Sequence, residues 1–548
     1  MNSENENEIE KKDTVNNKLN KKSGLKSLLK SGLSLSVLTL FSRIFGLIRQ
    51  MTLAKFLGTS SLADAYQVAF NVPNLFRRLF AENSISVAFI PTFKGYLEDS
   101  DSPDGKKAAQ NFVSATLTLL SFVTVSFVVI CIIFTPLLMR IFYKEGDTAS
   151  ITEATLLTRI MFPYLALISI AALFQGILNA LKIFSPSGFT PILFNGIVIA
   201  SAYILSPHMA NPARAMAIGV VAGGAVQAFF QLPFVLKNNW KVTFTSLKNA
   251  FTNPGTRRVL ALIGPTIIGM AAYQVNDIVS SALATRTGEG VFSSLSYSLR
   301  MQELILGICA VTIGTVILPD LTAFANKQQW NEFSSMLSYS LKIMAFIAIP
   351  ITFYSLLMDK SLISLLFQTG QFDSESTEMT ARVFRCHIIG LYFIALNRIL
   401  APAFYAQQDT VKPTVAGIIN FAVNIILASI FCKIWGGPGI AIALTIASFV
   451  NTVVLFIFLA KNQNISNKVV LTSSILYSLR MILFSVIASV PVYFLRWKII
   501  ELFQGHHRFI SQGVPVIITA LIFAVIGIGL MVVTRDPLIK TLARKLKR

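Results

Sequence analysis

Apolar residues form long, nearly unbroken runs that recur along most of the chain and are separated by short polar segments. Fourteen runs are long enough to cross a bilayer as a helix, which takes about 20 residues. Their ranges are 32–57, 64–94, 110–139, 152–181, 187–206, 214–236, 259–284, 293–323, 334–358, 379–406, 413–432, 438–460, 473–495 and 510–534. The pattern predicts an all-α polytopic membrane protein with about 14 transmembrane helices. The alternating strands that build an outer-membrane barrel are not found in the sequence.

The composition agrees with this class and argues against others. Of 548 residues, 54% are hydrophobic and 13% are charged, whereas a soluble domain carries about 25% charged residues. Much of the net charge of +21 lies in tails and loops rather than on a soluble domain, so we expect no nucleic-acid partner. The four cysteines lie singly within apolar runs and form no metal-binding or disulfide pattern.

The distribution of basic residues predicts the orientation in the membrane. An even number of spans places both termini on one side, and cytoplasmic segments carry an excess of Lys and Arg. If the N-terminus is inside, the inner segments hold 26 Lys and Arg and the outer segments hold 9. We therefore expect both termini in the cytoplasm, with residues 1–25 as a disordered polar tail and residues 535–548 as a basic tail.

A faint internal repeat divides the predicted helices. Residues 176–195 and 401–420 lie 225 positions apart, and each leaves a helix rich in small residues, passes a polar turn with proline and reaches an asparagine. Six helices separate the two, so both have the same orientation, as in a parallel repeat. Chance similarity of apolar helices is the alternative. The repeat predicts two six-helix lobes plus two additional C-terminal helices. The predicted parts are an N-lobe at 30–236, an interlobe linker at 237–258, a C-lobe at 259–460 and the additional helices at 473–534.

Ionisable residues inside the predicted spans are the most informative positions. An arginine at the centre of a transmembrane helix costs about 2.5–3.5 kcal/mol on insertion scales, so it should face a hydrated cavity or pair with an acid. The residues concerned are Arg43, Arg49, Asp64, Arg77, Arg78, Glu82, Arg300, Glu303, Arg382, Arg385, His387 and Arg398. Two interpretations follow, a shared cationic chamber or separate ion pairs.

A shared chamber would require the first two spans to bend. Arg43 and Arg49 are six residues apart, about 9 Å along a straight helix and on different faces. A bend at Gly46 would direct both guanidinium groups to one chamber, and Pro73 offers the second span a similar break before Arg77. In the alternative, the arginines are neutralised by acids. The candidate pairs are Arg77 or Arg78 with Glu82 and Arg300 with Glu303, with pairing also open for the arginines of 379–406.

The chemistry of such a chamber indicates an anionic substrate. Guanidinium groups stay charged and donate paired hydrogen bonds to phosphate and carboxylate oxygens, so a diphosphate is a natural ligand. An exporter of cationic drugs would carry acids there instead. The sequence has no Walker A loop, HExxH motif or nucleophile elbow, so we expect no enzymatic activity. Transport would then draw on ion gradients or on the membrane potential.

Several segments resemble the bacterial lipid II flippase family (MurJ/MviN). Residues 41–91 carry a Ser-Arg, Gly and Arg helix, a Phe-Gly turn, an Asp-Ala pair and the run PNLFRRLFAE in the order typical of that family. Further similar segments follow in order within about 30–460. They are FPYLALISIAALFQGILNA at 162–180, SYSLRMQELILGICAVTIGTVILP at 296–319, LFQTGQFD at 366–373 and APAFYAQQDTVKP at 401–413.

The resemblance implies a MOP-type fold with two V-shaped lobes around a cationic cavity. It implies that the chain moves lipid II, the undecaprenyl-diphosphate-linked peptidoglycan precursor, from the inner to the outer leaflet by alternating access. It assigns diphosphate binding to Arg43, Arg49, Arg77 and Arg300. Supporting or gating roles fall to Asp64, Glu82, Glu303, Gly46 and Pro73. The two additional helices at 473–534 would form a groove for the lipid tail.

The chain also departs from the family pattern. Gln50 follows the second arginine of the first span where many members have Asp, and Asn83 stands where many have Gly. Some members bind Na⁺ through an acid on the seventh span and polar residues on the eleventh. Here Asp277, Asn420 and Asn424 offer oxygens for Na⁺, with polar helix packing as the alternative. No other cofactor is expected.

Lipid II flipping for cell-wall synthesis in the bacterial cytoplasmic membrane is the leading hypothesis. A related MOP-superfamily exporter of another lipid-linked glycan or of drugs is the alternative within transport. A non-transporting membrane scaffold for wall synthesis is the alternative from another class, and a membrane glycosyltransferase would need an acidic loop site that the sequence lacks. We expect a monomer whose partners are lipid II and membrane lipids, with cell-wall synthesis proteins as further candidates.

Overall fold

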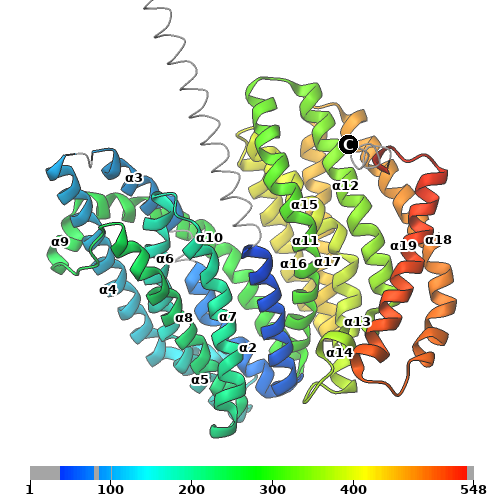
Figure 1. Cartoon of the computed structure of the whole chain (residues 1–548), viewed down its shortest axis with the longest axis horizontal. Coiled ribbons are helices and arrows are strands. Elements are labelled where there is room, and N and C mark those ends of the chain that lie inside the picture. Colours follow the sequence, from blue (N-terminus) through cyan, green and yellow to red (C-terminus); the bar gives the residue numbers. More distant parts are fainter. Residues whose placement is uncertain (1–37, 79–84, 100–101, 540–548) are drawn as a thin grey trace, which may run out of the picture. The chain divides into compact units, whose positions relative to one another are not determined.

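The computed structural model describes residues 38–78, 85–99 and 102–539, which form helices and turns without a β-strand. The predicted tail at 1–25, Glu82, Asn83 and residues 540–548 of the predicted basic tail lie outside this part of the chain. The first half contains a helix at 38–57, α2 Ser61–Arg77, η2 Ile85–Phe89, α3 Ile90–Glu98, α4 Pro103–Phe142, α5 Thr148–Met161, α6 Pro163–Ala180, α7 Ser185–Leu205, η3 Ser206–His208, α8 Pro212–Lys237, α9 Leu247–Thr252 and α10 Pro254–Thr287 (Figure 1). The second half contains α11 Val291–Asn326, α12 Trp330–Leu357, α13 Asp359–Phe367, α14 Ser374–Ile389, α15 Leu391–Ala406, α16 Val411–Trp435, α17 Gly437–Ala460, η4 Lys468–Thr472, α18 Ser473–Leu502, η5 Phe509–Gly513 and α19 Val514–Val533.

The helices are long and apolar enough for a multi-pass membrane protein, as predicted. In the described part of the chain, nine helices could each cross a membrane by length and composition, or ten if the bent pair α14 and α15 is one span. Helix also covers most described residues in the ranges predicted for the first, second, seventh and eighth spans. The all-helical class is therefore confirmed, while the number of fourteen spans stays a prediction.

Breaks in the predicted spans have local causes. The range 152–181 is split between α5 and α6 at Pro163, which has no amide hydrogen to continue the helical ladder. α14 and α15 meet at Gly390 with a bend of 41°. An added Cβ at Gly390 would lie 2.6 Å from Thr445 Oγ1, so a side chain there would push α17 away. The helices run without interruption through Gly46 and Pro73, and a flexible role for these two positions stays a prediction.

The described chain divides into two compact units. Unit 1 consists of Met1–Arg49, Ala69–Pro136 and Thr155–Ala271 as far as they are described. The remaining described residues form unit 2, so residues 50–68 and 137–154 pack with the C-terminal half. The repeat of two six-helix lobes stays a prediction.

Unit 1 includes an aromatic core between α3, α4 and α6. Phe89 and Phe112 stack with ring centroids 5.4 Å apart, and Trp240 meets Phe93 edge-on at 4.9 Å. Residues 238–253, most of the predicted linker, are bound along α4. The amide N–H of Lys241 donates to Gln110 Oε1 at 2.9 Å, and Gln110 Nε2 donates to the Lys241 carbonyl at 2.7 Å. The linker is thus a structured part of unit 1.

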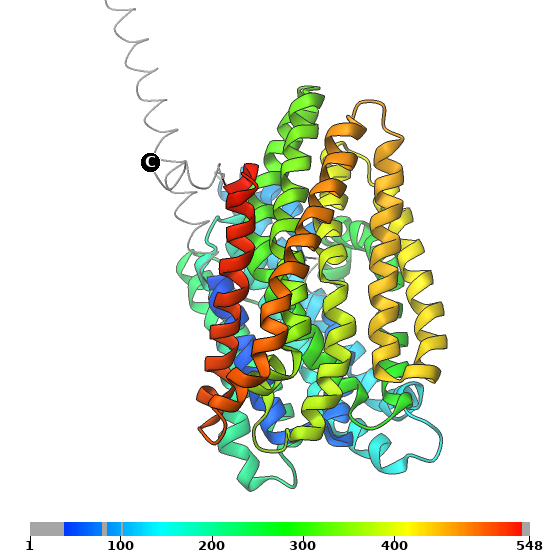
Figure 2. The same ribbon diagram turned by 90° about the vertical axis from the view of Figure 1, so that its right-hand side faces the viewer.

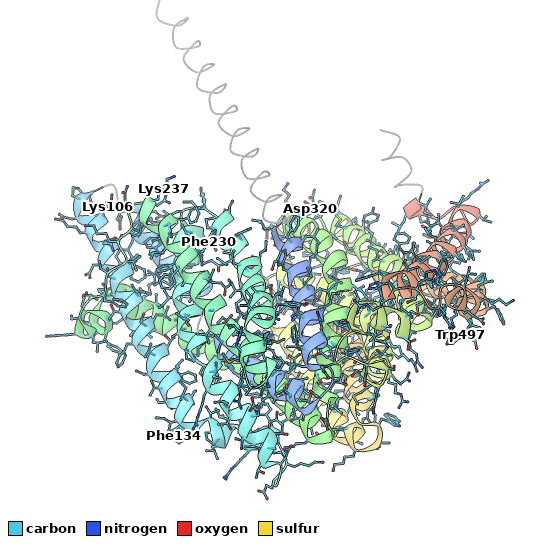
Figure 3. The ribbon with its side chains drawn as sticks, turned by 60° about the horizontal axis from the view of Figure 1, so that its bottom comes forward. Lys106, Phe134, Phe230, Lys237, Asp320 and Trp497 are labelled. Atoms are coloured by element: carbon cyan, nitrogen blue, oxygen red, sulfur yellow. The ribbon has the colours of Figure 1, made fainter. Side chains whose placement is uncertain are left out.

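Two lysines that are far apart in the sequence lie at the same end of unit 1. Lys106 and Lys237 lie at one end, and Phe134 lies toward the other (Figure 3). Lys106 follows the second predicted span and Lys237 follows the sixth, so the predicted path of the helices returns both to the same side of the membrane, in agreement with their common end (Figure 3).

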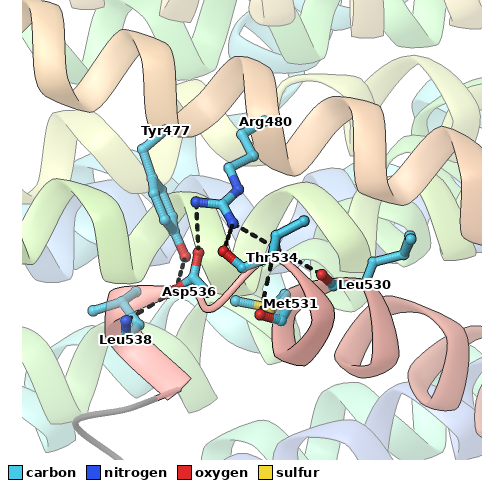
Figure 4. A network of polar contacts seen from close by, with 7 residues as sticks. All are labelled: Tyr477, Arg480, Leu530, Met531, Thr534, Asp536 and Leu538. Atoms are coloured by element: carbon cyan, nitrogen blue, oxygen red, sulfur yellow. Dashed lines mark hydrogen bonds and ion pairs between the residues drawn. The ribbon is translucent and has the colours of Figure 1, made fainter.

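In unit 2, α18 and α19 pack together, and α18 also packs against α12 (Figures 1 and 2). Tyr354 of α12 donates its hydroxyl hydrogen bond to the Val516 carbonyl at 2.5 Å. At the end of α19, the buried Asp536 carboxylate accepts from the Leu538 amide at 2.9 Å and lies 3.5 Å from Arg480 Nη1 of α18 (Figure 4). These contacts bind the two additional C-terminal helices to the body of unit 2.

Candidate substrate-binding site

Arg49 lies on aromatic side chains in unit 1. Its guanidinium carbon is 4.8 Å from the ring centroid of Phe70 on α2 and 5.7 Å from that of Phe194 on α7. Tyr164 of α6 supports the second ring, with centroids 5.5 Å apart. Cation–π contacts of this kind contribute about 0.5–2 kcal/mol, and they leave the positive charge in place.

Close packing of small residues positions these rings. An added Cβ at Gly46, one turn before Arg49, would lie 3.9 Å from Asn195 Nδ2, so the first helix passes close to α7. Behind α7, added Cβ atoms at Gly223 and Gly224 of α8 would lie 2.8 Å from Phe194 and 2.6 Å from Tyr164. The glycines of α8 therefore set where the two rings lie and, through them, where Arg49 lies.

Arg77 lies at the end of α2, also in unit 1. Its Nε donates to Asn74 Oδ1 at 2.9 Å, which is a neutral acceptor. A cation in the last turn of a helix is also favoured by the helix dipole. Phe76 meets Phe127 of α4 edge-on at 4.7 Å and holds this end of α2. Arg43 lies on the first helix and is half-buried.

Arg300 lies in unit 2, on α11. Its Nη1 is 3.0 Å from Glu303 Oε2, so the pairing within one helix is present. The two side chains remain 37% and 56% exposed. Such exposed pairs contribute about 0–1 kcal/mol, because water competes for both groups. The pair is therefore weak enough for Arg300 to exchange its partner for another anion.

Asp64 fixes the beginning of α11. Its buried carboxylate accepts hydrogen bonds from the amide groups of Gly290 at 2.8 Å and Ser293 at 2.7 Å. These are amide hydrogens that the first turn of a helix leaves without intrahelical partners. The Tyr297 hydroxyl adds a bond to the Gly58 carbonyl at 2.9 Å. Asp64 thus acts on the arginine-bearing helix from its capped end rather than beside Arg300.

The arginines of α14 follow the pairing alternative. Arg385 Nε bonds the Asp359 carboxylate, and Arg382 Nε lies 3.1 Å from Glu378 Oε1. His387 is buried, with Nδ1 2.7 Å from Ser298 Oγ. Asp373 caps α14, and the Ser376 amide at 2.8 Å lowers the pKa of its carboxyl group. These groups anchor α13, α14 and α11 to one another, whereas Arg398 is exposed.

The predicted cation ligands lie on α10 and α16 of unit 2. Asn424 Nδ2 donates to Asn276 Oδ1 at 2.8 Å. The buried Oδ1 atoms of Asn420 and Asn424 have no hydrogen-bond donor among the described residues. Two buried amide oxygens on adjacent turns of α16, with Asp277 on the neighbouring helix, are the kind of donor set that suits Na⁺. No group of three His, Cys, Asp or Glu that could hold a metal is found in the described chain.

An apolar groove of about 380 Å³ lies between α12, α18 and α19 of unit 2. Its lining includes Pro350, Phe484, Ala488, Phe523 and Ile528. This is where the resemblance placed a groove for a lipid tail.

Sequence reasoning missed the aromatic residues Phe70, Phe194 and Tyr164. Each lies in an apolar run, where a ring facing lipid and a ring facing an arginine look the same. The one available signal was Asn195, the repeat asparagine directly after Phe194, which marks a polar position on α7.

The fold and the charged residues define a multi-pass helical membrane transport protein with arginines inside its spans. More closely, the chain belongs to the lipid II flippase MurJ family, because the family model described as "Lipid II flippase MurJ" matches residues 53–533. The "Probable lipid II flippase MurJ" of Treponema pallidum (strain Nichols) is 45% identical over 512 residues, which cover 93% of this chain and 96% of that protein.

Two solved structures support the fold. A lipid II flippase MurJ in an inward closed conformation matches with a TM-score of 0.75 and 24% identity, covering 92% of this chain and 99% of that chain. An inward-facing multidrug resistance MATE family transporter of the MOP superfamily matches with a TM-score of 0.61 and 14% identity, covering 76% and 93%. The predicted family and the MOP-type helical fold are therefore confirmed.

Proposed function

We propose that this chain moves lipid II from the inner to the outer leaflet of the bacterial cytoplasmic membrane by alternating access, and so supplies precursor for peptidoglycan synthesis. The observation that carries the proposal is membership of the lipid II flippase MurJ family over nearly the whole chain. The arginines inside the spans fit an anionic, diphosphate-linked substrate. The protein acts as a transporter and not as an enzyme.

Arg43, Arg49 and Arg77 of unit 1 and Arg300 of unit 2 bind the diphosphate in this proposal. Arg49 is supported for this role by its contacts with Phe70 and Phe194, because rings hold the guanidinium face while its hydrogen-bond donors lie in the plane of the group. Arg300 exchanges its exposed carboxylate partner for the substrate. Asp64, Glu82 and Glu303 support these arginines, and Gly46 and Pro73 allow the helices to bend.

The undecaprenyl tail lies in the apolar groove of α12, α18 and α19. The groove is lined almost wholly by aliphatic and aromatic side chains, which suits a hydrocarbon chain. The headgroup then moves while the tail stays in an environment like that of the bilayer.

The driving force is the membrane potential, Na⁺ or both. A potential that is negative inside favours outward movement of an anion by about 2.3 kcal/mol per charge per 100 mV. Asp277, Asn420 and Asn424 are the proposed Na⁺ ligands. NaCl should raise the unfolding temperature of the purified protein more than equal KCl does, and Asn424→Ala should abolish the difference. Equal stabilisation by both salts would remove Na⁺ from the proposal.

The protein is proposed to work as a monomer with both termini in the cytoplasm, alongside membrane lipids and cell-wall synthesis proteins. The test of the function is complementation of cells whose own lipid II flippase is depleted. The readout is lipid II accessible to an external lipid II-binding peptide. Wild type should restore both accessibility and growth. A scaffold would restore growth when all cavity arginines are removed, and a drug exporter would change drug resistance without changing accessible lipid II.

A further inference from the structure

A polar cavity of about 500 Å³ lies in unit 2 where α12 ends, between α13, α14, α18 and η5. Charged and polar side chains contribute much of its wall, in contrast to the apolar groove. The lining of the polar cavity includes Asp359, Lys360, Gln368, Arg385, Arg496 and Trp497. None of them belongs to the predicted diphosphate site.

Positive charge exceeds negative charge around this cavity. Lys360 Nζ lies 2.5 Å from Glu378 Oε2, and the same glutamate also serves Arg382 at 3.1 Å. Asp359 is paired with Arg385. Within the described residues, no carboxylate forms an ion pair with Arg496, and Arg508 donates to the neutral Gln368 carbonyl at 2.8 Å. Among the ionisable residues that line the cavity, there are thus three cations, Lys360, Arg385 and Arg496, and one acid, Asp359.

Arg496 is held in place before any ligand binds. Its Nη1 donates to the Leu357 carbonyl at 2.5 Å. Its guanidinium carbon lies 4.9 Å from the Tyr493 ring centroid and 5.0 Å from that of Trp497. A fixed guanidinium loses less conformational freedom when it binds an anion, so the arrangement favours binding.

The surface of α18 next to the cavity has the residues typical of the boundary between the hydrocarbon core and the lipid headgroups of a membrane. Tyr493, Phe494 and Trp497 are 53%, 69% and 61% exposed, and exposed aromatic residues of this kind gather at membrane interfaces. Val486, Val490 and Phe494 follow one another at intervals of four on the exposed face of α18, at 45%, 51% and 69% exposure. An apolar strip thus leads along α18 to a cationic cavity.

We propose that this cavity binds the phosphate headgroup of a membrane lipid, through Lys360 and Arg496, while the hydrocarbon chains lie on the apolar strip of α18. The phosphate oxygens accept hydrogen bonds from the guanidinium and ammonium groups, and Glu378 keeps its bond to Arg382 when Lys360 turns to the ligand. The site is separate from the arginines proposed for transport.

The test is lipid binding to the purified full-length chain in detergent, measured by native mass spectrometry. The probes are phosphatidylglycerol, zwitterionic phosphatidylcholine and inorganic phosphate. We expect phosphatidylglycerol to bind about fivefold or more tightly than phosphatidylcholine, because only the first carries a net negative charge. Arg496→Gln and Lys360→Gln should each weaken that binding about fivefold to tenfold, because each removes a charge-assisted hydrogen bond.

Lys498→Gln is the matched control, since it removes a cation two residues from Arg496 but outside the cavity lining. It should bind lipid as the wild type does. Lys360 has a side chain that is 52% exposed, so its variant keeps the test valid if Arg496→Gln fails to fold. An equal loss in Lys498→Gln, equal binding of phosphatidylcholine, or binding of inorganic phosphate alone would each overturn the proposal. The assay needs no transport, so its result is independent of the proposed function.

Discussion

Arg49 in unit 1 and Arg385 in unit 2 both lie inside predicted spans, yet the protein accommodates their charges differently. Arg385 bonds the Asp359 carboxylate through its Nε, and the carboxylate neutralises its charge. Arg49 lies against the faces of Phe70 and Phe194, which attract the cation without cancelling it. An arginine held by rings can still bind an anion, whereas one held by a carboxylate serves as a structural link. The comparison separates binding candidates from anchors.

Removing Arg49 should have the largest effect. Arg49→Ala should lower outer-leaflet lipid II about tenfold or more in the complementation assay, because a cation held for the diphosphate is lost. Arg49→Lys should retain part of the activity, since it keeps the charge but loses the planar fork of donors. The control is Lys433→Ala, which removes an exposed cation at the end of α16. Normal accessibility with Arg49→Ala at wild-type abundance would contradict the proposed role.

Removing the charges of the Arg385–Asp359 pair in unit 2 should leave lipid II transport nearly unchanged. Arg385→Gln together with Asp359→Asn removes both charges of the anchor and leaves polar groups of similar size. Once protein abundance is matched, we expect accessible lipid II within about twofold of wild type. The net charge does not change, because an uncharged Gln–Asn pair replaces an ion pair whose two charges cancel. Loss of transport equal to that of Arg49→Ala would erase the distinction between the two arginines.

The packing that positions the rings of unit 1 is the next test. Gly224→Ala places a Cβ 2.6 Å from Tyr164 and should destabilise the protein by about 1–3 kcal/mol through overpacking. Gly196→Ala on α7 is the matched control, because an added Cβ there meets nothing within 4 Å. That variant should be neutral or more stable by up to about 1 kcal/mol. Thermal unfolding in detergent measures both, and equal behaviour would show that α8 yields to the added methyl group.

Much of the fold could be predicted from the sequence, because span length and apolar continuity follow directly from bilayer thickness. The break at Pro163 was not predicted: the sequence favoured one span over 152–181, and the missing amide hydrogen of the proline explains why two helices form instead. The helices α9 and α13 were not predicted, since each is short and lies between apolar runs. The arginines were identified by the cost of their charge in lipid. Their partners were not, because that cost is the same whether a ring or a carboxylate compensates it.

Contacts between residues that are far apart in the sequence could not be predicted either. Asp64 caps α11 by accepting a hydrogen bond from the Gly290 amide, 226 residues away, and no local sequence pattern predicts such a bond. Arg385 and Asp359 lie 26 residues apart on different helices, so pairing was considered for that arginine without a partner being assigned. The Arg300–Glu303 pair could be named in advance, as one of two alternatives, because helical spacing alone brings its members together.

Asp64→Asn should have a moderate effect on stability. The amide keeps the shape of the carboxylate but offers an NH₂ group to one of two backbone donors, so one bond is lost and two donors face each other. We expect a loss of about 1–2 kcal/mol in the free energy of unfolding. Asp409→Asn is the control, because Asp409 also accepts a backbone amide at the start of a helix, that of Lys412, but is only partly buried, and Lys412 lowers the pKa of its carboxyl group. A loss in Asp64→Asn no larger than in the control would show that the cap contributes little.

The smallest effect concerns the ion pair on α11. In a double-mutant cycle of Arg300→Gln and Glu303→Gln, thermal unfolding should give a coupling of about 0–1 kcal/mol, because both side chains are substantially exposed. The two single variants should differ in how much lipid II they transport. Arg300→Gln should reduce accessible lipid II strongly, whereas Glu303→Gln should leave more of it, since the arginine stays available to the diphosphate. If coupling is instead above about 2 kcal/mol and both variants lose transport equally, Arg300 is an anchor like Arg385, and unit 2 would then contribute no binding arginine of this set.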